Sequence, residues 1–188
     1  MQQKKKAAYK FGSPPDQERS YKYPNVFAVE KTTGPERLVI APSSHHVSLL
    51  LDLMQMMFEP FRILYVLVFP GGGEAGRYQV ANPVGWNEAE GFLTRFEDFF
   101  ENDGRHHIRV SSVGTSDLLV YDNHNVIYAY GELQEFNRIL VKRGLEKVDA
   151  VEFPSPHRHM CNAAYDQAQQ EVLRYWEWKQ LPLQESDD

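Results

Sequence analysis

The chain has 188 residues, a formal net charge of −6 and a composition of 42% hydrophobic, 13% aromatic and 24% charged residues. This composition is that of an ordinary globular protein, and the length suits one domain with a substantial core. The single cysteine, Cys161, excludes an internal disulfide framework and favours a reducing compartment, so we expect a cytoplasmic protein.

The charge is unevenly distributed along the chain. Residues 1–24 hold six basic and two acidic side chains, which leaves a charge of −10 for the rest. An acidic body repels phosphate backbones, so we do not expect nucleic acid as a partner of the folded part. The apolar stretch 47–69 contains Asp52, Glu59 and Arg62, so it does not predict a membrane span and no membrane partner is expected.

The two ends of the chain differ from its body. Residues 1–22 are polar, rich in lysine and interrupted by Pro14 and Pro15, which predicts a disordered basic tail. Residues 181–188 are predicted to form an acidic C-terminal tail. Residues 23–180 contain no repeat and no linker, so we expect them to form a single domain.

Within the body, strand and helix signals follow one another in chain order. We predict strands over 26–30, 37–41, 62–69, 77–81, 107–112, 117–122, 125–130 and 148–153. We predict helices from Ser43 or Ser44 to about 58, from an N-cap at Asn87 with Glu90 three residues later, over 132–143, and over 162–178. Hairpins outnumber parallel crossovers, so the sequence predicts a single-domain α+β fold, with a mostly antiparallel, mixed sheet of hairpins and about four helices packed against it.

The hairpin between 117 and 130 contains the candidate binding residues. A two-residue loop at Asn123 and His124 would pair Tyr121 with Val126. Side chains alternate along a strand, so this register places Leu118, Val120, Ile127 and Ala129 on one face and Leu119, Tyr121, Val126, Tyr128 and Tyr130 on the other. The second face suits either a covering helix or a ligand groove, and Tyr121, Tyr128 and Tyr130 are the predicted binding residues.

Two stretches have motif-like spacing. The glycine-rich run 71–76 matches G-x-G-x-x-G, but a strand rather than a helix follows it, which favours a hairpin loop without a nucleotide cofactor. His157, His159 and Cys161 would share one face of an extended segment and are suitable zinc ligands. Their spacing matches no established zinc motif, so we predict a loop and expect no metal and no cofactor.

No catalytic residue is predicted. The candidate nucleophiles Ser111, Ser112 and Cys161, the candidate base His124 and the candidate acids Asp117 and Asp122 lack the local context of a catalytic motif. We therefore expect a non-catalytic binding protein of the inhibitor, immunity or adaptor type. It would bind a protein partner with a basic surface, or itself, through an acidic, aromatic-rich surface. The alternative is a small enzyme or ligand-binding domain with a pocket lined by the three tyrosines.

Overall fold

The structure is a computed structural model that describes residues 9–12 and 20–187. Its strands are β1 (Phe11–Gly12), β2 (Val26–Glu30), β3 (Arg37–Ala41), β4 (Phe61–Leu67), β5 (Gly76–Val80), β6 (His106–Ser112), β7 (Leu118–Tyr121), β8 (Ile127–Tyr130), β9 (Glu146–Lys147), β10 (Arg158–His159) and β11 (Trp178–Leu181). Its helices are α1 (His46–Met54), α2 (Trp86–Arg95), α3 (Glu97–Asn102), α4 (Leu133–Lys142) and α5 (Asp166–Tyr175), with 3-10 turns at Ala163–Tyr165 and Glu185–Asp187.

The described strands form one large sheet and one short ladder. The large sheet has nine strands in the order β11-β5-β4-β6-β7-β8-β3-β2-β9, and its neighbours are antiparallel except for β2 and β9. The separate ladder pairs β1 with β10. The predicted α+β fold with a mostly antiparallel sheet is therefore confirmed. None of the described helices has the length and apolar character needed to cross a membrane.

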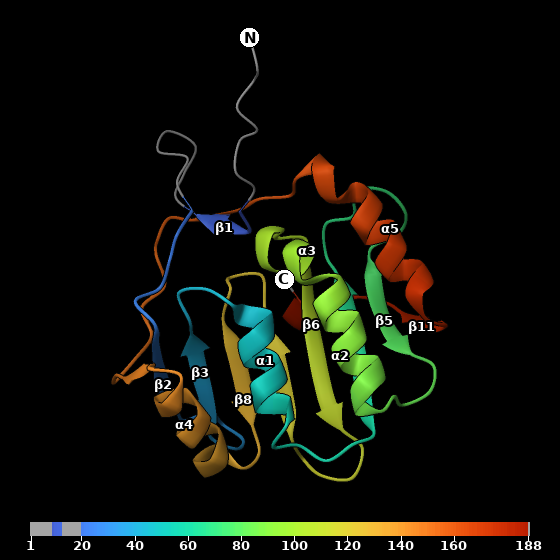
Figure 1. The fold of residues 1–188 in the computed structure, drawn as a ribbon. Coiled ribbons are helices and arrows are strands. Elements are labelled where there is room, and N and C mark those ends of the chain that lie inside the picture. Colours follow the sequence, from blue (N-terminus) through green and yellow to red (C-terminus); the bar gives the residue numbers. More distant parts are fainter. Residues whose placement is uncertain (1–8, 13–19, 188) are drawn as a thin grey trace.

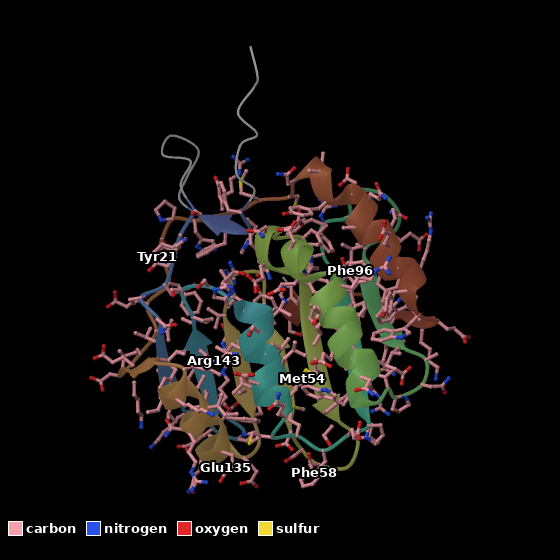
Figure 2. The ribbon with its side chains drawn as sticks, viewed as in Figure 1. Tyr21, Met54, Phe58, Phe96, Glu135 and Arg143 are labelled. Atoms are coloured by element: carbon pink, nitrogen blue, oxygen red, sulfur yellow. The ribbon has the colours of Figure 1, made fainter. Side chains whose placement is uncertain are left out.

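One face of the sheet packs against a layer of helices (Figure 1). Along β4, Phe61, Ile63 and Tyr65 point into this layer and are buried, whereas Arg62 between them is exposed. This alternation is the signature of a strand with one covered face. The helices are also tied to each other, because Arg143 at the end of α4 donates hydrogen bonds to Asp52 and Ser48 of α1 (Figure 2).

Several predicted element boundaries are wrong for local reasons. The first helix begins at His46 because His45 has a left-handed backbone with φ 57°, and neither predicted serine caps it. The N-cap of α2 is Gly85 rather than Asn87, and the Glu88 side chain accepts the Gly85 N–H at 3.2 Å. The predicted strand over 148–153 is absent, and the chain leaves helical geometry after Tyr175 to form β11.

Part of the predicted disordered tail is buried. Lys10 and Phe11 are each 1% exposed, and β1 pairs with β10 near the other end of the chain. Phe11 belongs to a second apolar cluster with Tyr23, Val39 and Val126 on the side of the sheet opposite the helices. The prediction of disorder is therefore wrong for residues 9–12 and 20–22, where Ser20 bridges to Gly12 and the Tyr21 N–H donates to the Phe11 carbonyl at 3.1 Å. Residues 1–8 and 13–19 lie outside the described part of the chain.

A buried arginine connects α5 to the sheet. Arg105 is 1% exposed and binds both carboxylate oxygens of Asp103, through Nε at 2.7 Å and Nη2 at 3.1 Å. Its Nη1 atom donates to Asp166 at 2.8 Å and to Gln169 at 2.9 Å, both on α5. Because these partners neutralise the guanidinium and use most of its donors, the charge can be buried.

The glycine-rich run is a hairpin loop, as predicted. It joins the antiparallel strands β4 and β5, and the Gly71 N–H donates to Gln169 of α5 at 2.8 Å. A Cβ atom at Gly71 would lie 2.1 Å from an Asp166 carboxylate oxygen and 2.3 Å from Arg105 Nη1. Gly71 is therefore required by the close approach of this arginine network.

Candidate functional site

The β7–β8 hairpin has a register that differs by one residue from the predicted one. Tyr121 pairs with Ile127, and the loop contains three residues because Asn125 adopts a left-handed backbone with φ 60°. A one-residue slip moves a strand's side chains to the opposite face. Leu119 and Tyr121 therefore face the helices, whereas Leu118 and Val120 join Tyr128 and Tyr130 on the other face. The predicted faces of the four β7 residues are wrong.

Tyr121 is in the core. Its side chain has 0% exposure, its hydroxyl donates to Asn125 at 2.7 Å, and Lys10 Nζ lies 3.7 Å from its ring centroid. Burial raises the pKa of the Tyr121 hydroxyl well above its ordinary value. Of the three predicted binding residues, Tyr121 thus has no surface to offer a partner.

Tyr128 and Tyr130 lie on the face of the sheet opposite the helix layer, which we call the open face. Two rows of paired side chains cross it: Leu64, Arg109, Val120 and Tyr128 in one, and Arg62, Ser111, Leu118 and Tyr130 in the other. Both tyrosines are half-buried. Arg37 Nη1 donates to the Tyr130 hydroxyl at 2.8 Å, and the Arg37 guanidinium lies 4.3 Å from the Tyr128 ring centroid.

The C-terminal segment returns to the open face. Asp187 is 1% exposed, accepts a hydrogen bond from Arg109 Nη2 at 2.6 Å, and lies 3.6 Å from Arg77 Nε. The predicted acidic tail is therefore docked at this residue by two arginines. A carboxylate already fits this part of the face, because an arginine presents its donors in the geometry that a carboxylate accepts.

A hollow of about 420 Å³ lies on the open face, with the apolar side chains of Leu118 and Val120 on its floor beside Tyr128 and Tyr130. Arg37, Arg109, His107, Asp122, Asn123, His124 and Ser186 also line it. A second hollow of about 300 Å³ shares Arg109 and Leu118 with the first and extends to Arg62. The two hollows therefore adjoin at Arg109 and Leu118, and arginines line both of them together with Asp122 in the first and Asp117 in the second.

The charge of this surface is opposite to the predicted one. The open-face strand positions carry Arg37, Arg62, Arg77, Arg109 and Lys179 against Glu30 and Glu146, and Asp187 is docked against Arg77 and Arg109. The whole chain has a charge of −6, so this face is a basic region on an acidic protein. Tyr128 and Tyr130 therefore do not lie in the acidic surroundings that the sequence suggested.

Three histidines meet at the edge of this face. His124, His157 and His159 each offer one ring nitrogen, and these nitrogens lie within 4.8 Å of one another. The turn after β7 supplies His124, and β10 and the residue before it supply the other two. His159 and His157 were candidates from the sequence, but Cys161 is exposed and is not part of this cluster. His124, which is distant in the sequence, supplies the third ring nitrogen instead of Cys161.

Burial favours the neutral form of one ring in the cluster. Burial lowers the pKa of His159 to about 4, and repulsion from His124 and His157 adds to the effect. Burial opposes ionisation of Asp122, but hydrogen bonds from His124 and the Val126 N–H lower the pKa of this carboxyl below its ordinary value. The cluster therefore combines a neutral His159 ring with the ionised Asp122 carboxylate beside His124.

The other candidate catalytic residues are not assembled into a site. The Ser112 hydroxyl donates to the Phe58 carbonyl at 2.6 Å, and Asp117 accepts the Glu132 N–H at 3.3 Å. Within the described ranges, Ser111 and Cys161 form no hydrogen bond with His124, which binds Asp122 instead. Ser112, Asp117 and Asp122 therefore have structural hydrogen bonds that account for their positions.

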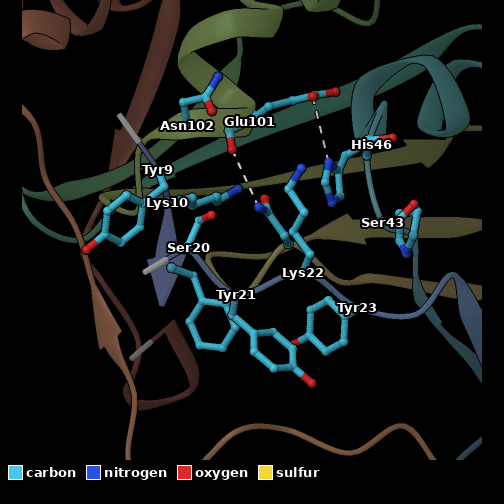
Figure 3. Close-up of a pocket in the computed structure, with 14 residues that line it drawn as sticks. Tyr9, Lys10, Ser20, Tyr21, Lys22, Tyr23, Ser43, His46, Glu101 and Asn102 are labelled. Atoms are coloured by element: carbon cyan, nitrogen blue, oxygen red, sulfur yellow. Dashed lines mark hydrogen bonds and ion pairs between the residues drawn. The ribbon is translucent and has the colours of Figure 1, made fainter. Parts of the chain in front are cut away.

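A separate hollow of about 310 Å³ lies beneath the docked N-terminal segment (Figure 3). Lys10 on its wall donates to the Phe100 carbonyl at 3.0 Å. Burial lowers the pKa of Lys10 to about 7, partly offset by Asp122, Asp103 and Glu101. Because its ammonium group is engaged by a carbonyl and the Tyr121 ring, Lys10 acts here as an anchor for the N-terminal segment.

The comparisons with known proteins give no family. The chain matches no family model, no curated protein and no solved structure. The function therefore has to be inferred from the residues of the open face and of the histidine cluster.

Two neighbouring histidines predict an acid-sensitive fold. His106 has 0% exposure and His107 has 8%, and burial lowers the pKa of His106 well below 6.5 and that of His107 to about 4, where Asp122 opposes the effect in part. The unfolded chain binds these protons near pH 6.5, so the free energy of unfolding should fall as the pH falls from 7 toward 4. For His107 the loss is about 2 kcal/mol between pH 7 and 5.

Urea denaturation at pH 7 and pH 5 measures this effect. His107→Gln should lose less stability between the two values than the native chain does, whereas His45→Asn, at an exposed histidine, should behave like the native chain. Equal losses in His107→Gln and the native chain would show that His107 does not cause the acid sensitivity.

Proposed function

We propose that this is a non-catalytic binding protein whose open face takes an acidic segment of a partner protein. Support comes from one observation above all: half-buried Tyr128 and Tyr130 line a hollow of the sheet face together with Arg37 and Arg109. Tyrosine and arginine are the residues that most often dominate binding energy in protein interfaces. The proposal keeps the predicted class of function and reverses the predicted charge of the partner.

The arginines support a carboxylate-bearing partner rather than a phosphate backbone. Arg37 already binds Glu30, and Arg109 already binds Asp187. The acidic body around the basic face disfavours an extended nucleic acid, which would meet negative charge beyond it. An acidic protein segment can bind within the basic face and does not have to extend over the acidic surface around it. We place this binding in the cytoplasm, because the single thiol of Cys161 suits a reducing compartment.

The proposal can be tested by co-purification with a charge-reversal variant. Arg62 is exposed on the open face, so Arg62→Glu should leave the fold intact and remove most of the retained partner. The matched control is Arg138→Glu, at an arginine on α4 whose side chain is 72% exposed. Retention by the native chain should also weaken as salt is raised, because exposed charges are screened.

The outcomes separate the two classes of function. Loss of a stoichiometric protein partner in Arg62→Glu but not in Arg138→Glu supports the proposal. Equal retention by both variants contradicts it. Co-purification of a small organic molecule without a protein partner would favour the alternative function, a ligand-binding domain that uses the same hollow.

A further inference from the structure

The hydrogen bonds of the three clustered histidines place a proton on the Nδ1 atom of each ring. His124 Nδ1 lies 3.0 Å from an Asp122 carboxylate oxygen, His157 Nδ1 lies 2.9 Å from the Pro154 carbonyl oxygen, and His159 Nδ1 lies 3.1 Å from the Asn123 carbonyl oxygen. Ionised carboxylates and carbonyls can only accept, so each Nδ1 atom carries a proton. In a neutral imidazole the lone pair then resides on Nε2.

This arrangement brings lone pairs together. His124 Nε2 and His157 Nε2 are 3.3 Å apart, and a nitrogen of His159 lies within 4.8 Å of both. Two lone pairs at this distance repel each other unless a cation lies between them. A zinc ion with bonds of about 2.0–2.1 Å and tetrahedral angles holds its nitrogen ligands about 3.4 Å apart. The 3.3 Å between His124 and His157 therefore matches two ligands of a shared ion, and the His159 nitrogen lies close enough to reach the same ion after a small shift.

We propose that His124, His157 and His159 bind a divalent transition-metal ion of the zinc class, with a fourth coordination position open to water. Imidazole nitrogen is a preferred ligand for such ions. Each ring has its other nitrogen bound to an oxygen acceptor, which is the outer hydrogen bond that orients metal-binding histidines. His157 is exposed, so the ion has a path of entry.

The fold gives the cluster a rigid support. The Phe11 ring contacts all three imidazoles, with centroid distances of 5.4 Å to His124, 5.2 Å to His157 and 5.9 Å to His159. Phe11 is 1% exposed, and its strand β1 pairs with β10, which carries His159. The docked N-terminal segment therefore forms one wall of the metal site, and this site is separate in its chemistry from the binding of an acidic partner.

Metal analysis of tag-free protein tests the proposal. The purified full-length chain is loaded with Zn²⁺, desalted and analysed for bound zinc, and Co²⁺ is added in parallel because its visible spectrum reports tetrahedral coordination. We expect about one ion per chain, with a melting temperature above that of the metal-free chain, because an ion that binds the folded state stabilises it.

Three variants locate the ion. His157→Gln, at an exposed position, should keep the fold and weaken Zn²⁺ binding by more than the roughly 10–100-fold that loss of an outer hydrogen-bond partner costs. Cys161→Ser should bind zinc like the native chain, because Cys161 is outside the cluster. His45→Asn controls for the removal of an exposed histidine elsewhere and should also bind normally.

The proposal is overturned by any of three results. The first is a native chain that retains no zinc after loading and desalting, which would leave a proton as the shared cation. The second is unchanged zinc affinity in His157→Gln. The third is zinc loss in Cys161→Ser, which would assign the ion to the ligand set that the sequence alone suggested.

Discussion

Replacing Phe11 by alanine should lower the free energy of unfolding by roughly 3–5 kcal/mol, the usual loss when a large buried aromatic side chain is truncated. Phe11 is 1% exposed and packs against Tyr21, Tyr23 and the three clustered histidines. Truncation leaves a cavity between the N-terminal segment and the open face. Urea unfolding followed by circular dichroism measures the loss, and deletion of residues 1–12 should cost at least as much.

Phe58 provides the matched control for this experiment. Its side chain is 70% exposed at the end of the segment that follows α1 (Figure 2), so Phe58→Ala should change stability by no more than about 0.5 kcal/mol. If the two phenylalanine variants lose equal stability, or if deletion of residues 1–12 leaves the melting temperature unchanged, the N-terminal segment is not docked in solution.

Replacing Arg105 by methionine should cost roughly 3–5 kcal/mol, because it leaves the buried carboxylate of Asp103 without its partner. Asp103 has 0% exposure and also accepts the Asn162 N–H at 2.8 Å, so it cannot turn toward water. The same change also frees α5, which holds Arg105 through Asp166 and Gln169. Denaturant unfolding gives the loss in stability directly.

An arginine with an exposed side chain provides the matched control for this substitution. The Arg95 side chain is 58% exposed and pairs with Glu171 at 3.3 Å, so Arg95→Met should cost less than about 1 kcal/mol. A loss in Arg105→Met no greater than in Arg95→Met would show that the buried network does not support the fold.

Local patterns in the sequence are sufficient to predict most strands of the sheet. The strands Val26–Glu30 and Arg37–Ala41 have the predicted bounds, because β-rich runs on either side of a Gly-Pro turn leave little freedom of register. The β7–β8 hairpin shows where such reasoning fails. Asn125 takes a left-handed backbone and adds one residue to the loop, and this single conformational choice reverses the faces of β7.

The candidate sites depend on contacts that no local pattern contains. His157 and His159 could be grouped from the sequence because alternate residues of an extended segment share a face. His124 lies far from them along the chain, and the register of β1 with β10 and the turn after β7 bring it close. Phe11 lies in a short stretch between a lysine run and Pro14, where no strand or helix periodicity marks it as buried.

The most direct test of the proposed function is photo-cross-linking from the open face. A photo-cross-linking amino acid is placed at position 130, on the open face, and in a separate variant at position 175, on α5, as the control. The proposal predicts that the cross-linker at 130 captures a partner protein in the source cells, that the captured peptide is rich in aspartate and glutamate, and that Arg62→Glu abolishes the product. Capture of the same partner from position 175, or of a basic peptide from position 130, would contradict it.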